Sequence, residues 1–147
     1  MSERPRLISG GVASDDRGRV YFANDFDLSN CRRLYVVENF SPGTVRAWHA
    51  HRYERKWVLP VGGAALACCV EIDDWERPSP DAEMHRFVLD AANPAVLAVP
   101  PGYANGAMSL APDTKLLYLS DTPLGGSLED DVRFPARHWD PWQVTER

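Results

Sequence analysis

Short apolar segments alternate with turn-forming residues along the whole chain, and the spacing typical of amphipathic helices is nearly absent. Glycine, proline and serine separate the segments, as in the turn 41–43 and at the glycine pair 62–63. Seven segments have the length and the apolar content of β-strands: 33–40, 45–51, 56–60, 64–72, 85–89, 95–99 and 115–120. The pattern predicts an all-β sandwich or barrel. We expect residues 1–147 to form a single domain, with a tail over 134–147 that is irregular or holds one short helix.

The composition is that of a globular protein, and it narrows the range of partners. The chain has 147 residues, 44% of them hydrophobic, and a formal net charge of −5. Because its arginines are scattered, no nucleic-acid partner is expected. No apolar stretch is long enough to cross a membrane, and the first residues lack the apolar core of a secretory signal. The three cysteines cannot all pair within the chain, so we expect a protein of the reducing cytoplasm.

The clearest local signal is the pair His49 and His51 in the predicted strand 45–51. Residues two apart in a strand face the same side, so both imidazoles point toward whatever this strand lines. Glu54 follows three residues later, and these three side chains are potential metal ligands. A second turn, Pro100-Pro101-Gly102, precedes Asn105, which is a poor replacement for an imidazole ligand. We therefore expect neither a metal nor a cofactor, and a metal-dependent enzyme is kept as an alternative.

These stretches resemble the two motifs of the cupin superfamily, whose fold is a jelly-roll β-barrel. Within the cupins, the chain is similar to the nucleotide-sugar 3,5-epimerases that act on dTDP-4-keto-6-deoxyglucose. The resemblance spans about residues 15–142. It is carried by Asp16-Arg17-Gly18, Arg46-Ala47-Trp48-His49, Lys56-Trp57-Val58, Val99-Pro100-Pro101-Gly102-Tyr103-Ala104-Asn105-Gly106, Leu117-Tyr118-Leu119-Ser120 and the segment 131–142.

The resemblance implies an epimerase that acts at C3, at C5 or at both through an enolate, in deoxysugar biosynthesis. It implies His49 as the base that removes a proton beside the C4 ketone. Lys56 is implied to stabilise the enolate oxygen, and Tyr118 to return a proton on the opposite face of the sugar. Arg17, Tyr35, Arg46, His51 and Asn105 are expected to bind the substrate, the arginines through its diphosphate. In the family the Arg17 segment often reaches across a dimer interface, so a homodimer is implied.

Two alternatives come from the same residues. The 3,4-ketoisomerases that act on the same substrate are similar through Arg33-Leu34-Tyr35 and through the run from Arg46 to His51, and their site would pair Tyr35 with His49 or His51. The epimerases also have an orienting aspartate and a second tyrosine that have no counterpart here, with Glu38 or Asp140 as possible substitutes for the aspartate. A cupin that binds a nucleotide sugar without catalysis is the alternative that these differences favour.

Overall fold

The computed structural model describes residues 3–144 and 146–147, and nearly all regular structure in them is β. The strands are β1 (Arg6–Ser9), β2 (Gly11–Asp15), β3 (Gly18–Phe22), β4 (Arg33–Asn39), β5 (Val45–Ala50), β6 (Lys56–Gly62), β7 (Ala64–Glu71), β8 (Met84–Asp90), β9 (Ala95–Val99), β10 (Tyr103–Ser109), β11 (Thr114–Ser120) and β12 (Val132–Arg133). One short helix, α1 (Leu124–Glu129), lies between β11 and β12.

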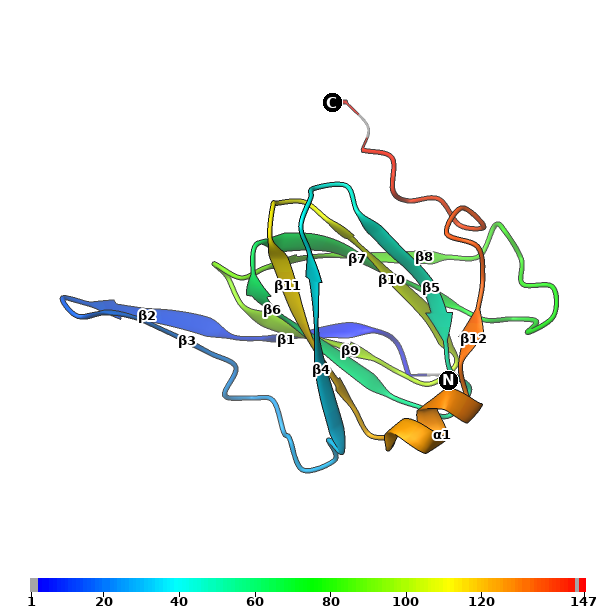
Figure 1. Ribbon diagram of the computed structural model, residues 1–147, viewed down its shortest axis with the longest axis horizontal. Helices are drawn as coiled ribbons and strands as arrows, with labels where there is room; N and C mark the ends of the chain where they lie inside the picture. The colour runs from blue at the N-terminus through cyan, green and yellow to red at the C-terminus, as the bar shows by residue number, and fades with distance from the viewer. Residues whose placement is uncertain (1–2, 145) are drawn as a thin grey trace.

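Two antiparallel five-stranded sheets face each other and form a jelly-roll β-barrel (Figure 1). One sheet has the order β1-β9-β6-β11-β4, and the other has the order β12-β5-β10-β7-β8. The strands β2 and β3 form a separate hairpin that extends away from the barrel (Figure 1). The predicted all-β fold of the cupin type is confirmed.

All seven predicted strands are present, with ends that differ from the prediction by at most two residues. Among the described residues beyond Phe134 there are turns but no helix; the helix lies before the tail, over Leu124–Glu129, and was not predicted. The strand β10 was also missed, because its alanine, asparagine, glycine and serine residues are weak strand formers. In the described part of the chain, no helix is long and apolar enough to span a membrane.

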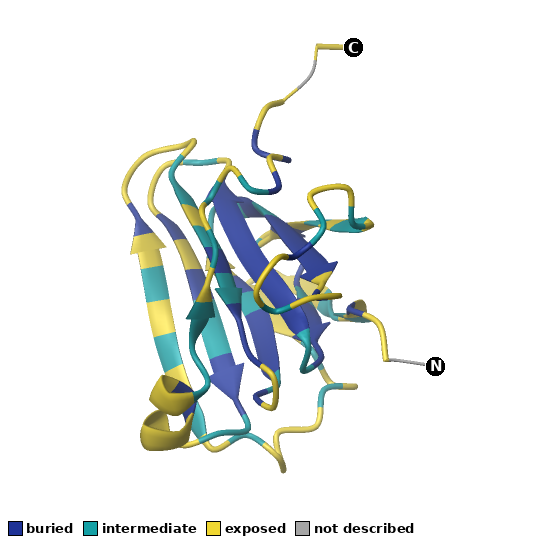
Figure 2. Cartoon of the chain, turned by 90° about the vertical axis from the view of Figure 1, so that its right-hand side faces the viewer, coloured by how far each residue is buried: buried dark blue, intermediate teal, exposed yellow. Residues whose placement is uncertain are grey.

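Buried side chains fill the space between the sheets, and a second buried cluster covers the outer face of the second sheet. In Figure 2 the buried residues lie mainly on the strands, whereas α1 is mostly exposed. The inner core is apolar and comes from six strands of the two sheets, β6 to β11. The outer cluster is centred on Trp48 of β5, which packs against Trp139 and Trp142 of the C-terminal segment. The outer cluster therefore anchors this segment, and the short strand β12 that precedes Phe134, to β5, which bears His49 and ends just before His51.

We predict that Trp48→Ala lowers the free energy of unfolding by about 3–5 kcal/mol, the usual cost of truncating a buried tryptophan. Trp48 is fully buried, and its indole Nε1 donates hydrogen bonds of 3.1 Å to the carbonyl oxygens of Ala136 and Trp139. Urea unfolding followed by circular dichroism measures the loss. Tyr53→Ala is the control, because Tyr53 is 79% exposed and its removal changes stability by about 0.5 kcal/mol or less. Equal stabilities of the two variants contradict an anchoring role for Trp48.

Candidate active site

A cavity of about 300 Å³ opens between the two sheets beside α1. Its walls come from β4, β5, β6, β10 and β11, with α1 and β12 at its rim. Seven of the eight side chains predicted from the sequence as catalytic or substrate-binding line it: Tyr35, Arg46, His49, His51, Lys56, Asn105 and Tyr118. The fold thus gathers polar and ionisable residues that are up to 83 positions apart in the sequence, from Tyr35 to Tyr118.

The strand β5 directs His49 toward the cavity and its neighbours Trp48 and Ala50 toward the outer cluster. Asn105 of β10 is opposite His49 in the sheet register, and its amide nitrogen donates a 3.1 Å hydrogen bond to the His49 carbonyl oxygen. Burial lowers the pKa of His49, the Arg133 charge lowers it further, and the Asp131 carboxylate opposes both. His49 is therefore neutral near pH 7, which is the form that accepts a proton.

Two tyrosines and a lysine form the opposite wall. Tyr35 of β4 and Tyr118 of β11 are direct partners in the sheet, and their rings stack with centroids 5.1 Å apart. Lys56 is buried, and its ammonium donates a 2.8 Å hydrogen bond to the Tyr35 hydroxyl. Burial strongly raises the pKa of Tyr118, so that its phenol keeps its proton at neutral pH. This wall therefore contains both a positive charge, on Lys56, and a protonated hydroxyl, on Tyr118.

The cavity has an excess of positive charge. Its cationic side chains are Arg33, Arg46, Lys56 and Arg133, and its one carboxylate is Asp131. The guanidinium of Arg46 is held by Asn39 at 2.7 Å, and that of Arg133 by Asp131 at 3.0 Å. Such a concave basic site attracts anionic small molecules, and guanidinium groups match phosphate oxygens in shape.

Sequence reasoning missed Arg33 as a cavity residue, as well as Asp131 and Arg133. Arg33 precedes Tyr35 by two positions in a strand, so the same alternation that paired the histidines could have found it. Asp131 and Arg133 carry no such signal. They reach the cavity because β12 pairs with β5, with Arg133 opposite His49 in the register, and that pairing joins segments over 80 residues apart.

The residues present do not fit a metal site. Glu54 was the third potential ligand, but its carboxylate accepts hydrogen bonds from Arg33, Ser120 and Ser127. The Asn105 amide is likewise used by the His49 backbone. Across residues 3–144 and 146–147, no three histidine, cysteine, aspartate or glutamate side chains are grouped as metal ligands are.

Three residues considered from the sequence lie away from this cavity. Arg17 is in the exposed turn between β2 and β3, where it pairs with Asp15. Glu38 is exposed on β4, and Asp140 lies 3.9 Å from Arg137 in the C-terminal segment. The expectation that Glu38 or Asp140 orients His49 is therefore not supported; Asp131 is the carboxylate whose charge acts on His49.

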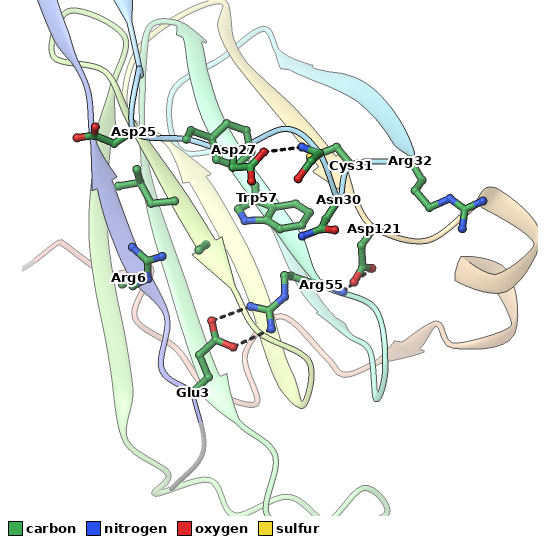
Figure 3. Close-up of a pocket in the computed structure, with 14 residues that line it drawn as sticks. Glu3, Arg6, Asp25, Asp27, Asn30, Cys31, Arg32, Arg55, Trp57 and Asp121 are labelled. Carbon is green, nitrogen blue, oxygen red and sulfur yellow. Dashed lines mark hydrogen bonds and ion pairs between the residues drawn. The ribbon is translucent and has the colours of Figure 1, made fainter.

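A wider cleft of about 1010 Å³ lies on the outer face of the β1-β9-β6-β11-β4 sheet, under the loop before β4 (Figure 3). Trp57 and Ala98 belong to its floor, and its charged side chains are of both signs, four carboxylates and three arginines. The Arg55 guanidinium is 2.7 and 2.8 Å from the Glu3 carboxylate oxygens (Figure 3). None of the eight predicted site residues lines this cleft, so the smaller cavity is the candidate active site.

We predict that Arg133→Gln moves the acidic limb of the pH profile of kcat/KM to higher pH. A histidine base works in its neutral form, at a pH above its pKa, so the lowered pKa of His49 extends activity toward acidic pH. Removing the Arg133 charge raises the pKa of His49, while burial, the larger cause, continues to lower it. Rate measurements between about pH 5 and 8 test the shift, because an unperturbed histidine titrates near 6.5. Arg137→Gln, at the exposed Arg137, is the control; identical limbs in both variants contradict the prediction.

Comparisons with known proteins identify the family of the chain. Residues 6–137 match the profile of the family described as dTDP-4-dehydrorhamnose 3,5-epimerase. No curated protein matches the sequence at a significant level.

Among solved structures, the chain is similar to the dTDP-4-dehydrorhamnose 3,5-epimerase of Bacillus anthracis with TDP and PPi bound, at 22% identity over 97% of this chain and 86% of that one, with a TM-score of 0.76. It is similar to ChmJ, a 3'-monoepimerase of Streptomyces bikiniensis, at 21% identity over 82% and 65% with a TM-score of 0.68. It is also similar to QdtA, a sugar 3,4-ketoisomerase of Thermoanaerobacterium thermosaccharolyticum, at 18% over 95% of each chain with a TM-score of 0.68. At these identities the likeness shows a shared fold.

Proposed function

The chain belongs to the family of dTDP-4-dehydrorhamnose 3,5-epimerases, which makes it an isomerase of nucleotide-linked sugars in deoxysugar biosynthesis, and we propose that it epimerises a nucleotide-linked 4-keto-6-deoxy sugar through an enolate. The observation that supports this proposal most is the meeting of a neutral histidine, a buried lysine and a protonated tyrosine in one cavity. These are the base, the electrostatic stabiliser and the acid that the reaction requires.

The proposed reaction begins at the carbon beside the C4 ketone. The His49 imidazole removes the proton from that carbon. The electron pair of the C–H bond becomes the C=C bond of the enolate, and the π pair of the carbonyl moves to the C4 oxygen. The Lys56 ammonium, fixed by its hydrogen bond to Tyr35, stabilises the negative oxygen. Tyr118 then gives its phenolic proton to the carbon from the opposite face, which inverts the centre. Solvent returns a proton to the phenolate and takes one from the imidazolium.

The nucleotide diphosphate binds, in this proposal, to the cations at the cavity. Arg46 and Arg133 are exposed side chains at its edge, each held in place by one polar partner. Asn105 and His51 are proposed to contact the sugar, since both are buried and line the cavity. Arg17 lies outside the cavity of its own chain, so it can contribute only to the cavity of another copy of the chain.

The test is proton NMR of dTDP-4-keto-6-deoxyglucose incubated with the protein in D₂O. Deuterium at C3, or at C3 and C5, with the carbonyl still at C4, supports the epimerase. The labelled positions also show whether one carbon centre reacts or two. Substrate that keeps all its protons argues against the proposal for this sugar.

A 3,4-ketoisomerase is the second candidate, and one observation favours it. Both His49 and His51 line the cavity together with Tyr35, which is the arrangement expected for that reaction from the sequence. The same NMR experiment separates the two, because a ketoisomerase moves the carbonyl from C4 to C3.

We also propose a cytoplasmic homodimer. The three cysteines are free thiols, as expected in a reducing compartment. On the outer face of the β1-β9-β6-β11-β4 sheet, Leu34 is 64%, Val36 53% and Val61 48% exposed, and an exposed apolar patch of this kind marks an interaction surface. The hairpin formed by β2 and β3 presents further exposed apolar residues, among them Val20 and Tyr21.

We predict that Val36→Glu converts the dimer to a monomer, because a charge on the buried interface leaves an unpaired carboxylate in apolar surroundings. Light scattering after gel filtration measures the mass. Val88→Glu is the matched control, since Val88 is 63% exposed on β8 of the other sheet. A wild-type protein that runs as a monomer, or a Val36→Glu variant that stays dimeric, contradicts this assignment of the interface.

A further inference from the structure

A fully buried carboxylate lies directly behind the candidate active site. The Glu54 side chain has 0% exposure and accepts hydrogen bonds from Arg33 at 3.0 Å, from Ser127 at 2.8 Å and from the Ser120 hydroxyl. Burial alone raises the pKa of Glu54, but the serine hydroxyls and the nearby positive charges outweigh it and lower the pKa. A carboxylate supplied with so many donors is an ionised group built into the fold rather than a surface acid.

Glu54 acts on His51, which is 4% exposed and lines the cavity. The His51 Nδ1 is 2.7 Å from the Asp130 carbonyl oxygen and 3.2 Å from the Glu54 Oε2. Both partners are acceptors, so Nδ1 must carry a hydrogen. These two acceptors occupy the Nδ1 side of the ring, which leaves Nε2 as the ring nitrogen without a fixed partner among the described residues.

The other ring nitrogen, Nε2, is buried and has no hydrogen-bond partner among the described residues. Buried polar atoms in folded proteins are rarely left unpaired, and an unpaired one at a cavity calls for a missing partner. With Nδ1 protonated, a neutral His51 offers a lone pair at Nε2. The complementary ligand group is a hydrogen-bond donor, and on a sugar that donor is a hydroxyl.

We propose that Glu54 is a positioning residue that, with the Asp130 carbonyl, holds His51 so that its bare Nε2 accepts a proton from a sugar hydroxyl, which makes His51 a second acid–base group beside His49. The role of His51 rests on the proposed function; the placement of its ring does not. When Nε2 takes the proton, the hydroxyl oxygen keeps the electron pair of its O–H bond. The positive charge on the ring is then paired with the Glu54 carboxylate 3.2 Å away.

The network also ties His51 to the rim of the cavity. Ser127 belongs to α1, and its hydroxyl donates to Glu54 while accepting a 3.0 Å hydrogen bond from Arg33. The Asp130 carboxylate, just after α1, accepts hydrogen bonds from the backbone nitrogens of Arg52 and Tyr53, both at 2.8 Å. The loop that follows His51 is thus fixed from the same side as the imidazole.

The first experiment is nitrogen-15 NMR of the imidazole side chains in the protein without ligand. We expect His51 to show the tautomer with Nδ1 protonated and Nε2 bare. A His51 that carries its hydrogen on Nε2 overturns the proposal, whatever the enzyme does to sugars.

The second experiment is Glu54→Gln, which keeps the shape and removes the charge. We expect kcat to fall about 10- to 100-fold, part of the roughly 10²–10⁴-fold that a proton-transfer group contributes, with KM nearly unchanged because the diphosphate contacts remain. The nitrogen-15 signals of His51 should move. Glu76→Gln, on an exposed loop, is the control with unchanged kinetics. If Glu54→Gln does not fold, Ser127→Ala tests the same link and should lower kcat in the same direction.

A folded Glu54→Gln variant with wild-type kcat and unmoved His51 signals overturns the proposal. If the wild type proves inactive on nucleotide 4-keto sugars while His51 shows the expected tautomer and responds to Glu54→Gln, the positioning role of Glu54 stands and the proposed function fails.

Discussion

Replacing His49 with alanine is expected to lower kcat/KM for the nucleotide 4-keto sugar by about 100- to 10,000-fold, the contribution of a positioned proton-transfer group. The imidazole is neutral at pH 7 because burial lowers its pKa, so it is the side chain prepared to take the carbon-bound proton. Without it enolate formation slows by the same factor, and deuterium from D₂O should enter the sugar correspondingly more slowly. Proton NMR of the substrate in D₂O follows uptake and epimerisation in one sample.

The control is His85→Ala, since His85 lies on β8 and does not line the cavity. It should retain the wild-type rate of deuterium uptake. If His49→Ala still exchanges protons at the wild-type rate, another group is the base, and His51 is then the candidate because it lines the same cavity.

The fold followed from the sequence because strand patterns are local. Alternation and turn residues identified seven strands, including the one that places His49 and His51 on one side. Strand β10 escaped because its small and polar residues show no alternation. It is nevertheless the central strand between β5 and β7, buried throughout, so its place is set by its neighbours rather than by its own propensity.

Only those cavity residues could be predicted that a single strand pattern or the family resemblance points to. Tyr35, Lys56 and Tyr118 were named from motifs in separate strands, and sheet pairing brings them together. The sequence could not show that Glu54 would be enclosed by Arg33 and two serines, because those partners lie 21 to 73 residues away. The spacing of His49, His51 and Glu54 suggested that Glu54 is a metal ligand, whereas the fold makes it a buried carboxylate held by hydrogen bonds.

Replacing Tyr118 with phenylalanine should separate proton removal from inversion. The phenol keeps its proton because burial raises its pKa, so it is a proton donor at neutral pH. Without the hydroxyl, formation of the inverted product should fall by about 100- to 10,000-fold. His49 is still present, so the enolate should still form and be reprotonated from the face it left. Deuterium should therefore continue to enter the sugar with the configuration unchanged.

This pattern, exchange without inversion, is specific to a missing acid on the second face. A general disturbance of the site lowers both processes together, and that outcome assigns Tyr118 to packing against Tyr35, on which its ring stacks. Tyr53→Phe supplies the control for loss of a tyrosine hydroxyl, because Tyr53 is exposed and does not line the cavity. Undiminished inversion in Tyr118→Phe rules out the phenol as the acid. The proton must then come from another group at the cavity, and Lys56, whose ammonium is hydrogen-bonded to Tyr35 of that stack, is the next candidate.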